Sequence, residues 1–94
     1  MSEFLHLRMR IEKKVWPEWF QSIIDGKKPF DIRLADFACK PGDTLVLKEW
    51  DPKTKEYTGR VIEKKVTYVA RLKEMPFWKK EDIEAYGFQV IGFK

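Results

Sequence analysis

The side chains most able to do chemistry in this chain lie close together: Lys27, Lys28, Asp31 and Arg33. Adjacent ammonium groups can bind phosphate as point charges, and a lysine whose pKa is lowered by burial can act as a base. In an extended chain, Asp31 and Arg33 would share one face about 7 Å apart and could orient a ligand. The alternatives are an exposed ion pair worth at most ~1 kcal/mol, and a solvated lysine that follows a helix.

A second set of candidates comprises Glu49, Trp50, Tyr57 and Arg60, which flank a polar loop. The two aromatic rings could stack on a nucleobase, or could simply pack against each other across a hairpin. Arg60 could bind a phosphate through two nitrogens, or Glu49 could neutralise it.

One histidine and one cysteine are too few for a structural zinc site, and no phosphate-binding glycine loop is present. We therefore predict no metal and no cofactor. The single cysteine, Cys39, excludes an internal disulfide and suggests a reducing compartment. Cys39 and His6 could form a nucleophile pair, but nothing in the sequence brings them together.

The composition predicts one soluble domain spanning residues 1–94, with 44% hydrophobic and 36% charged residues. The net charge of +4 favours anionic partners such as nucleic acid, nucleotides or an anionic lipid surface. The first ten residues contain no long apolar run, so we expect no membrane segment and a cytoplasmic protein. Absence of Asn beside abundant Lys and Glu hints at a thermophilic source.

The hydrophobic pattern predicts an α+β domain with the order β-α-β-β-β-α-β and short connections. Lys13 and Lys14 would connect the first strand to the first helix, and the basic side chains of His6, Arg8 and Arg10 would share the wet face of that strand. Because most connections are too short for parallel crossovers, we expect a mostly antiparallel small barrel of five to six strands with two short helices. Strands are expected at residues 4–11, from 30 onward, 44–50, 57–60, 61–72 and 88–93, and helices at 16–25 and 79–86. The first helix should bury a stripe of Trp16, Phe20, Ile23 and Ile24, and the strand at 44–50 is apolar enough to be central and buried on both faces.

Residues 26–33, followed by the turn and strand at 40–47, resemble the signature of ASCH domains of the PUA-like superfamily. The segments at 49–52, 57–60 and 66–68 are more similar to the small DUF3850 proteins. The resemblance covers residues 6–93. It implies a PUA-like pseudo-barrel, with a cleft beside the helix-to-strand loop proposed to bind RNA or nucleotides.

The resemblance also bears on catalysis. Some small bacterial relatives hydrolyse N4-acetylcytidine with a lysine, a threonine and a glutamate. Lys28 matches their lysine, but Asp31 stands where their threonine stands, so the nucleophilic hydroxyl is missing there. Pro29 replaces a threonine that is usual in the signature.

The first hypothesis is therefore an RNA- or nucleotide-binding module, favoured as a monomer without a membrane partner. The alternative is a hydrolase of N4-acylated cytidine nucleosides, with Lys28 as base and Asp31 or Glu49 as its acid/base partner. A third possibility is a protein-interaction domain that uses Phe77 and Trp78. The predicted ligand-binding set is Lys27, Lys28, Asp31, Arg33, Trp50, Tyr57 and Arg60.

Overall fold

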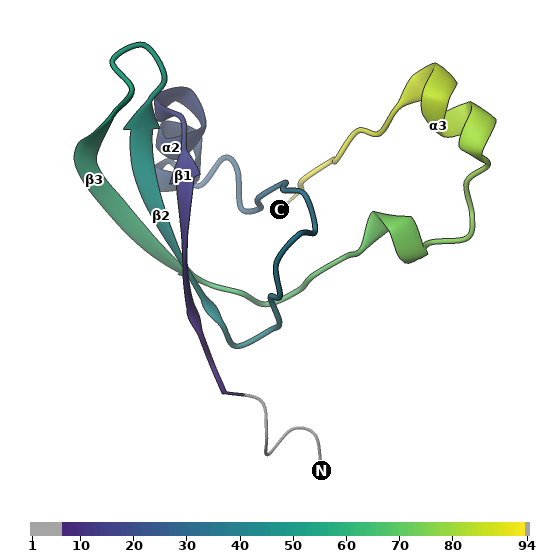
Figure 1. Cartoon of the computed structure of the whole chain (residues 1–94), viewed down its shortest axis with the longest axis horizontal. Helices are drawn as coiled ribbons and strands as arrows, with labels where there is room; N and C mark the ends of the chain where they lie inside the picture. The colour runs from purple at the N-terminus through teal and green to yellow at the C-terminus, as the bar shows by residue number, and fades with distance from the viewer. Residues whose placement is uncertain (1–6, 94) are drawn as a thin grey trace.

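The computed structural model describes residues 7–93, which form a three-stranded sheet, two α-helices and a 3-10 turn (Figure 1). In the sheet order β1-β2-β3, β1 runs parallel to β2, and β2 runs antiparallel to β3. The elements are β1 (Arg10–Val15), α2 (Pro17–Ile24), β2 (Thr44–Asp51), β3 (Glu56–Lys65), η1 (Leu72–Glu74) and α3 (Lys80–Tyr86).

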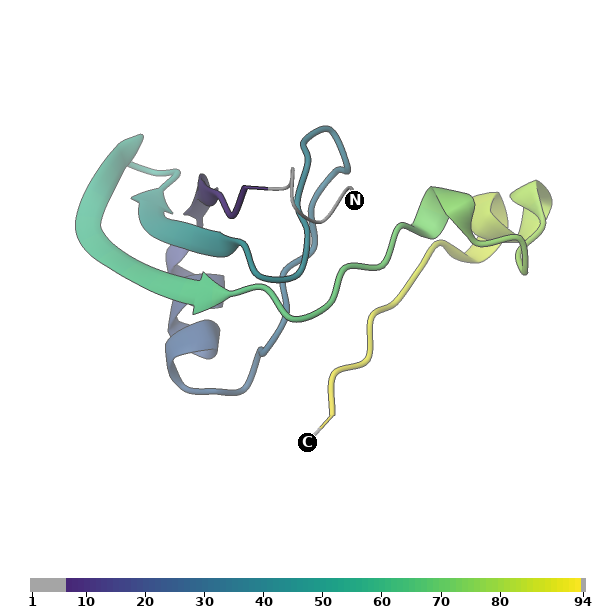
Figure 2. The same cartoon turned by 90° about the horizontal axis from the view of Figure 1, so that it is seen from below.

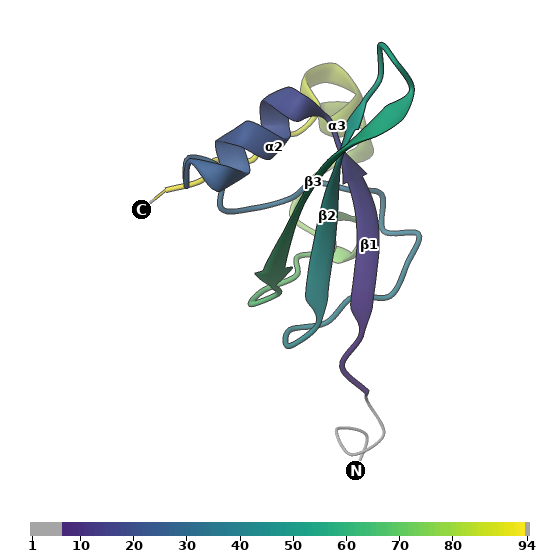
Figure 3. The ribbon, with the colours of Figure 1, turned by 90° about the vertical axis from the view of Figure 1, so that its left-hand side faces the viewer.

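Helix α2 packs against one face of the sheet and forms the core with it (Figure 3). Pro17 occupies the first helical turn, where its missing N–H costs nothing, and Gly26 at φ +74° follows the end of the helix. The buried core residues are Val15, Phe20, Ile23 and Leu47, with Leu45 and Ile62 packed against them.

The predicted helix at 16–25 is confirmed, but its buried stripe is narrower than expected. Phe20 and Ile23 are buried, whereas Trp16 and Ile24 are exposed. Trp16 instead stacks on Trp19, with ring centroids 5.3 Å apart. The prediction that 44–50 is a central strand buried on both faces is also confirmed, since β2 lies between the other two strands and buries Val46 and Leu47.

The predicted barrel of five to six mostly antiparallel strands is wrong. A barrel requires the last strand to pair with the first. In the described part of the chain, β1 and β3 remain the two edges of an open sheet. The mixed direction arises because α2 and the loop at 25–43 return the chain before β2 begins, which permits parallel pairing with β1.

The first strand lies later in the chain than expected. Lys13 and Lys14 belong to β1 rather than to a connection, and residues 4–6 of the predicted strand lie outside the described residues. Lys13 can face the core side because its ammonium lies 3.7 Å from the centre of the Phe37 ring, with its apolar stem partly buried.

The strand expected from Phe30 onward is likewise absent, since residues 30–33 form no ladder. The loop is held to β1 by a side chain instead: Nη2 of Arg33 donates to the carbonyl of Lys14 at 2.6 Å. A side-chain contact of this kind cannot be foreseen from hydrophobic alternation.

The C-terminal third leaves the sheet (Figure 2). The backbone of Val66 still pairs with Gly42 and Asp43, but the turn at 40–43 directs its partner strand away, so residues 67–71 have no ladder to join. The helix predicted at 79–86 is confirmed as α3, whereas the strand predicted at 88–93 is not formed. Within residues 7–93, no helix has the length and apolar character needed to cross a bilayer.

Candidate functional site

An open cleft of about 370 Å³ lies between the loop that follows α2 and the segment that follows β3. Its apolar wall comes from the sheet and α2 through Leu45, Leu47 and Ile23, together with aromatic side chains of both segments. The first segment contributes Phe30 and Phe37, and the second contributes Tyr68. The cleft therefore combines residues far apart in sequence.

Positive charge dominates this cleft. Five of its lining residues are cationic, and among the described lining residues Asp31 is the one acidic residue. Such an excess attracts anions, and the low-dielectric walls strengthen that attraction. The cations are Lys28, Arg33, Lys64, Lys65 and Arg71.

The end of α2 places Lys28 in the cleft. The backbone N–H groups of Lys27 and Lys28 both donate to the carbonyl of Ser22, at 3.0 and 3.1 Å, which fixes the direction of the chain. The ammonium of Lys28 donates to the carbonyl of Phe30 at 3.2 Å and lies 5.2 Å from the centre of that ring. Lys27, in contrast, is exposed and does not line the cleft.

Asp31 and Arg33 form the predicted ion pair, and it is largely buried. Nε of Arg33 donates to Oδ2 of Asp31 at 2.6 Å, and the two side chains are 25% and 14% exposed respectively. With Nη2 bonded to the carbonyl of Lys14, the guanidinium keeps Nη1 without a hydrogen-bond partner among the groups that the structure describes. Arg33 is thus fixed in place with the N–H groups of Nη1 still available.

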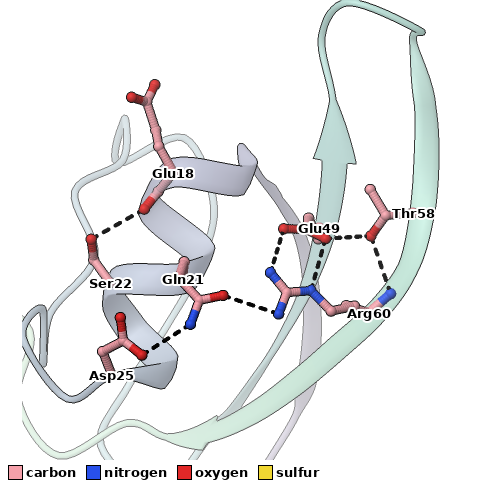
Figure 4. A network of polar contacts seen from close by, with 7 residues as sticks. All are labelled: Glu18, Gln21, Ser22, Asp25, Glu49, Thr58 and Arg60. Carbon is pink, nitrogen blue, oxygen red and sulfur yellow. Dashed lines mark hydrogen bonds and ion pairs between the residues drawn. The ribbon is translucent and has the colours of Figure 1, made fainter.

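Glu49 and Arg60 lie in a separate network on the α2 side of the sheet (Figure 4). Arg60 donates to both carboxylate oxygens of Glu49, through Nε at 3.0 Å and Nη2 at 2.8 Å, while Thr58 donates to Oε1 at 2.5 Å. Nη1 of Arg60 reaches Oε1 of Gln21 in α2 at 3.1 Å, and the guanidinium lies 4.9 Å from the centre of the Phe20 ring. We call this group the Glu49 network.

The bonds from Arg60 and then from Thr58 hold the pKa of the Glu49 carboxyl below its ordinary value, although burial opposes them. The Glu49 side chain is only 5% exposed, so its charge depends on these donors. A carboxylate with three committed donors is a poor general base.

A bulge in β3 brings both donors to Glu49. Trp50 pairs with Tyr57 and Lys48 pairs with Val61, so residues 58–60 of β3 lie opposite Glu49 alone. Gly59, at the middle of this bulge, has φ +99°, a conformation that L side chains rarely adopt.

Trp50 and Tyr57 form a cross-strand pair on the face of the sheet that points away from α2. Lysine ammonium groups lie over both rings: Lys14 is 4.6 Å from the centre of Trp50, and Lys48 is 4.7 Å from the centre of Tyr57. Neither aromatic residue lines the cleft.

The predicted site residues therefore fall into separate places. Lys28, Asp31 and Arg33 meet in the cleft, Glu49 and Arg60 belong to the Glu49 network, and Trp50 with Tyr57 lie on the opposite face of the sheet.

The predicted site residues do not include those that the end of β3 and the segment after it contribute to the cleft: Lys64, Lys65, Tyr68 and Arg71. Alternation in the predicted strand assigned only inward and outward positions and gave no indication that the chain would turn away there. The sequence signal that could have indicated these residues is the density of basic residues within a few positions of Tyr68.

Cys39 also lines the cleft, and burial, with a smaller contribution from Asp43, raises the pKa of its thiol. A thiol that resists ionisation is a weak nucleophile. Its suggested partner His6 lies outside the described residues.

Comparison with known proteins gives two matches. The chain is 35% identical over 63 residues to the "Uncharacterized 12.9 kDa protein in GpA 3'region" of Escherichia phage P2. The aligned region covers 67% of this chain and 56% of that relative, so the chain spans just over half of the phage protein's length. Residues 11–82 match the family described as "Domain of unknown function (DUF3850)", and the chain therefore belongs to that family.

Proposed function

We propose that this protein binds RNA or nucleotides, with the phosphate held in the cleft between the loop after α2 and the segment after β3. The observation that carries the proposal is the excess of five cationic residues over one carboxylate among the residues that line an aromatic-walled cleft. The resemblance of residues 26–33 to the ASCH signature supports the same function. A cytoplasmic location would give access to these ligands.

The size and chemistry of the cleft fit a nucleotide. Its volume of about 370 Å³ lies at the lower end of small-molecule sites, which span roughly 300–1,000 Å³. Lys28 and the available nitrogen of Arg33 can bond phosphate oxygens, since Lys28 uses one donor on the Phe30 carbonyl and has two more. Asp31 can accept a hydrogen bond from a sugar hydroxyl or a base.

The hydrolase alternative gains no support from this arrangement. Asp31 is paired with Arg33, and Glu49 is absent from the residues that line the cleft. Lys28 would therefore lack a nearby carboxylate free to move a proton, and it faces no hydroxyl nucleophile at position 31.

Calorimetric titration of uridine 5′-monophosphate at low and high ionic strength tests the binding proposal. We expect measurable binding at low salt that weakens as salt rises, because the attraction is electrostatic. Lys28→Ala should weaken binding by about tenfold, which corresponds to ~1.4 kcal/mol.

Lys27→Ala is the matched control. It removes the same positive charge at the neighbouring residue, whose side chain lies outside the cleft. We expect a change of less than about twofold, from long-range electrostatics alone. Uridine binding as tightly as its monophosphate, or equal losses in the two variants, would contradict the proposal.

A further inference from the structure

The face of the sheet opposite α2 carries an aromatic pair that no helix or strand of the described chain covers (Figure 1). Tyr57 is half exposed, and Trp50, its partner across the strands, is partly exposed. Both residues lie beside the hairpin at 51–56, which connects β2 to β3. Aromatic side chains on paired strands offer ring faces on which flat groups can stack.

Charge on this face matches a polyanion. A hollow of about 380 Å³ beside Tyr57 has one acidic lining residue, Glu12, among those the structure describes. The ammonium groups of Lys14 and Lys48 currently occupy positions over the rings of Trp50 and Tyr57. The cationic residues that line the hollow are Lys13, Lys14, Arg33 and Lys48, although the ammonium of Lys13 lies on the core side of the sheet, over Phe37.

Arg33 connects this face to the cleft. It lines both the cleft and the hollow beside Tyr57, and its bond to the carbonyl of Lys14 attaches it to β1 at the junction. A chain of phosphates could therefore pass from Lys28 over Arg33 to Lys14 and Lys48 and meet a cationic residue at each step.

From these contacts we propose that the ligand is a single-stranded polynucleotide rather than a free nucleotide. One nucleotide occupies the cleft, and neighbouring bases stack on Tyr57 and Trp50. This inference rests on the proposed function for the cleft but adds a second subsite on the other face of the sheet.

The interaction energies favour replacement of the lysine ammonium groups over the two rings by nucleobases. An exposed cation–π contact is worth about 0.5–1 kcal/mol, whereas stacking of a base on an aromatic side chain contributes about 1–3 kcal/mol. A base would displace each ammonium from its ring, and the displaced lysine would then bind the adjacent phosphate. Both interactions improve in the complex, so the lysines do not block the site.

Fluorescence polarisation of a labelled 12-nucleotide single-stranded RNA, beside titration of uridine 5′-monophosphate, tests this subsite. We expect the 12-mer to bind at least tenfold more tightly than the monophosphate. Tyr57→Leu should weaken the affinity for the 12-mer by about 5- to 150-fold, which corresponds to the loss of one stacked base, and should leave the affinity for the monophosphate unchanged. Tyr86→Leu is the matched control, because Tyr86 is an exposed tyrosine of α3 outside both hollows.

A double variant, Lys14→Gln with Lys48→Gln, gives an independent measure that does not depend on an aromatic substitution. Each lysine that meets a phosphate contributes about 0.7 to the salt slope for single strands, so the slope should become shallower by about 1.4. A DNA 12-mer and a duplex serve as further arms. Comparable binding of single-stranded DNA would show that the shared phosphate and base chemistry suffices, while tighter binding of duplex would contradict stacking.

The outcomes separate the two proposals. If the 12-mer binds no more tightly than the monophosphate, or Tyr57→Leu and the double lysine variant change nothing, the stacking subsite is wrong and the cleft can stand. If the affinity for the 12-mer depends on Tyr57 but not on Lys28, the stacking subsite is supported and the assignment of the cleft is wrong. If neither ligand binds at low salt, both are wrong.

Discussion

Two arginine–carboxylate pairs in this molecule contain the same chemical groups but differ in what those groups can do. In the pair of Arg60 and Glu49, the carboxylate is almost fully buried, both of its oxygens accept from the guanidinium, and Thr58 adds a third donor. In the pair of Arg33 and Asp31, a single contact joins the residues, and the guanidinium lines two hollows.

The difference between the two pairs indicates which arginine is able to bind a ligand. A guanidinium whose nitrogens are all committed joins structural elements, and Arg60 joins β2, β3 and α2 (Figure 4). A guanidinium that is oriented by two contacts but keeps one nitrogen available is prepared for a ligand. The comparison predicts that substitutions at the first pair change stability and substitutions at the second change affinity.

The largest effect is expected from Arg60→Met. This change leaves Glu49 as a buried carboxylate with Thr58 as its remaining donor, and a buried charge without its cationic partner should lower the free energy of unfolding. Urea unfolding followed by circular dichroism measures the loss.

A double variant, Arg60→Met with Glu49→Gln, should recover part of that stability, since it removes the stranded charge. The monophosphate affinity of any Arg60 variant that remains folded should be unaltered. A stable Arg60→Met protein with reduced affinity would reverse the roles assigned to the two pairs.

Acid should weaken the Glu49 network. Because the pKa of Glu49 is lowered in the folded state, the unfolded chain takes up the proton first as pH falls below about 4.5, the ordinary value for glutamate. The stabilisation is complete above that pH and is lost as pH falls through the folded pKa. Urea midpoints measured between pH 6 and pH 3 should therefore fall more steeply for the wild type than for Glu49→Gln.

A smaller effect, on binding alone, is expected from Asp31→Asn. Removal of the single acid among the described cleft residues should tighten uridine 5′-monophosphate binding by about fivefold at low salt, and the gain should shrink as salt rises. Asp36→Asn, in the same loop but outside the cleft lining, is the control and should have little effect. Weaker binding by Asp31→Asn would indicate that Asp31 contacts the ligand through its charge.

The smallest effect is expected at a third pair, Arg10 and Glu63, which resembles the Glu49 pair in geometry but not in burial. Its two contacts of 2.7 and 2.8 Å are as short, yet the side chains are 62% and 52% exposed. Water can replace each partner there, so Arg10→Gln should leave the urea midpoint at neutral pH unchanged. A clear loss would show that burial is not what separates the pairs.

Local signals in the sequence predicted the helices and the central strand well. Pro17 and Gly26 bound α2, and the density of apolar residues at 44–47 marked a strand buried on both faces. The first strand was misplaced because its continuation depends on the Lys13 ammonium lying over Phe37, a contact between residues 24 positions apart. The barrel was wrong because closure depends on long-range pairing that no local pattern encodes.

Part of the candidate site was also predictable. Lys28, Asp31 and Arg33 were proposed as a cluster because they are neighbours in sequence, and the structure places them in one cleft. Sequence reasoning could not separate them from Arg60, whose position depends on the bulge opposite Glu49. It also had no means to bring Arg71 into the same cleft, since that position follows from where the chain leaves the sheet.

The bulge at residues 58–60 has a consequence for insertions and deletions in this family. Because three residues of β3 lie opposite one residue of β2, the bulge adds two residues to β3. An even number keeps the alternation of inward and outward side chains in phase on either side of the bulge, with Ile62 facing α2 and Tyr57 facing away. Loss of a single residue there would turn either Ile62 or Tyr57 to the wrong face. Length variants at this position should therefore tolerate the loss of two residues better than the loss of one.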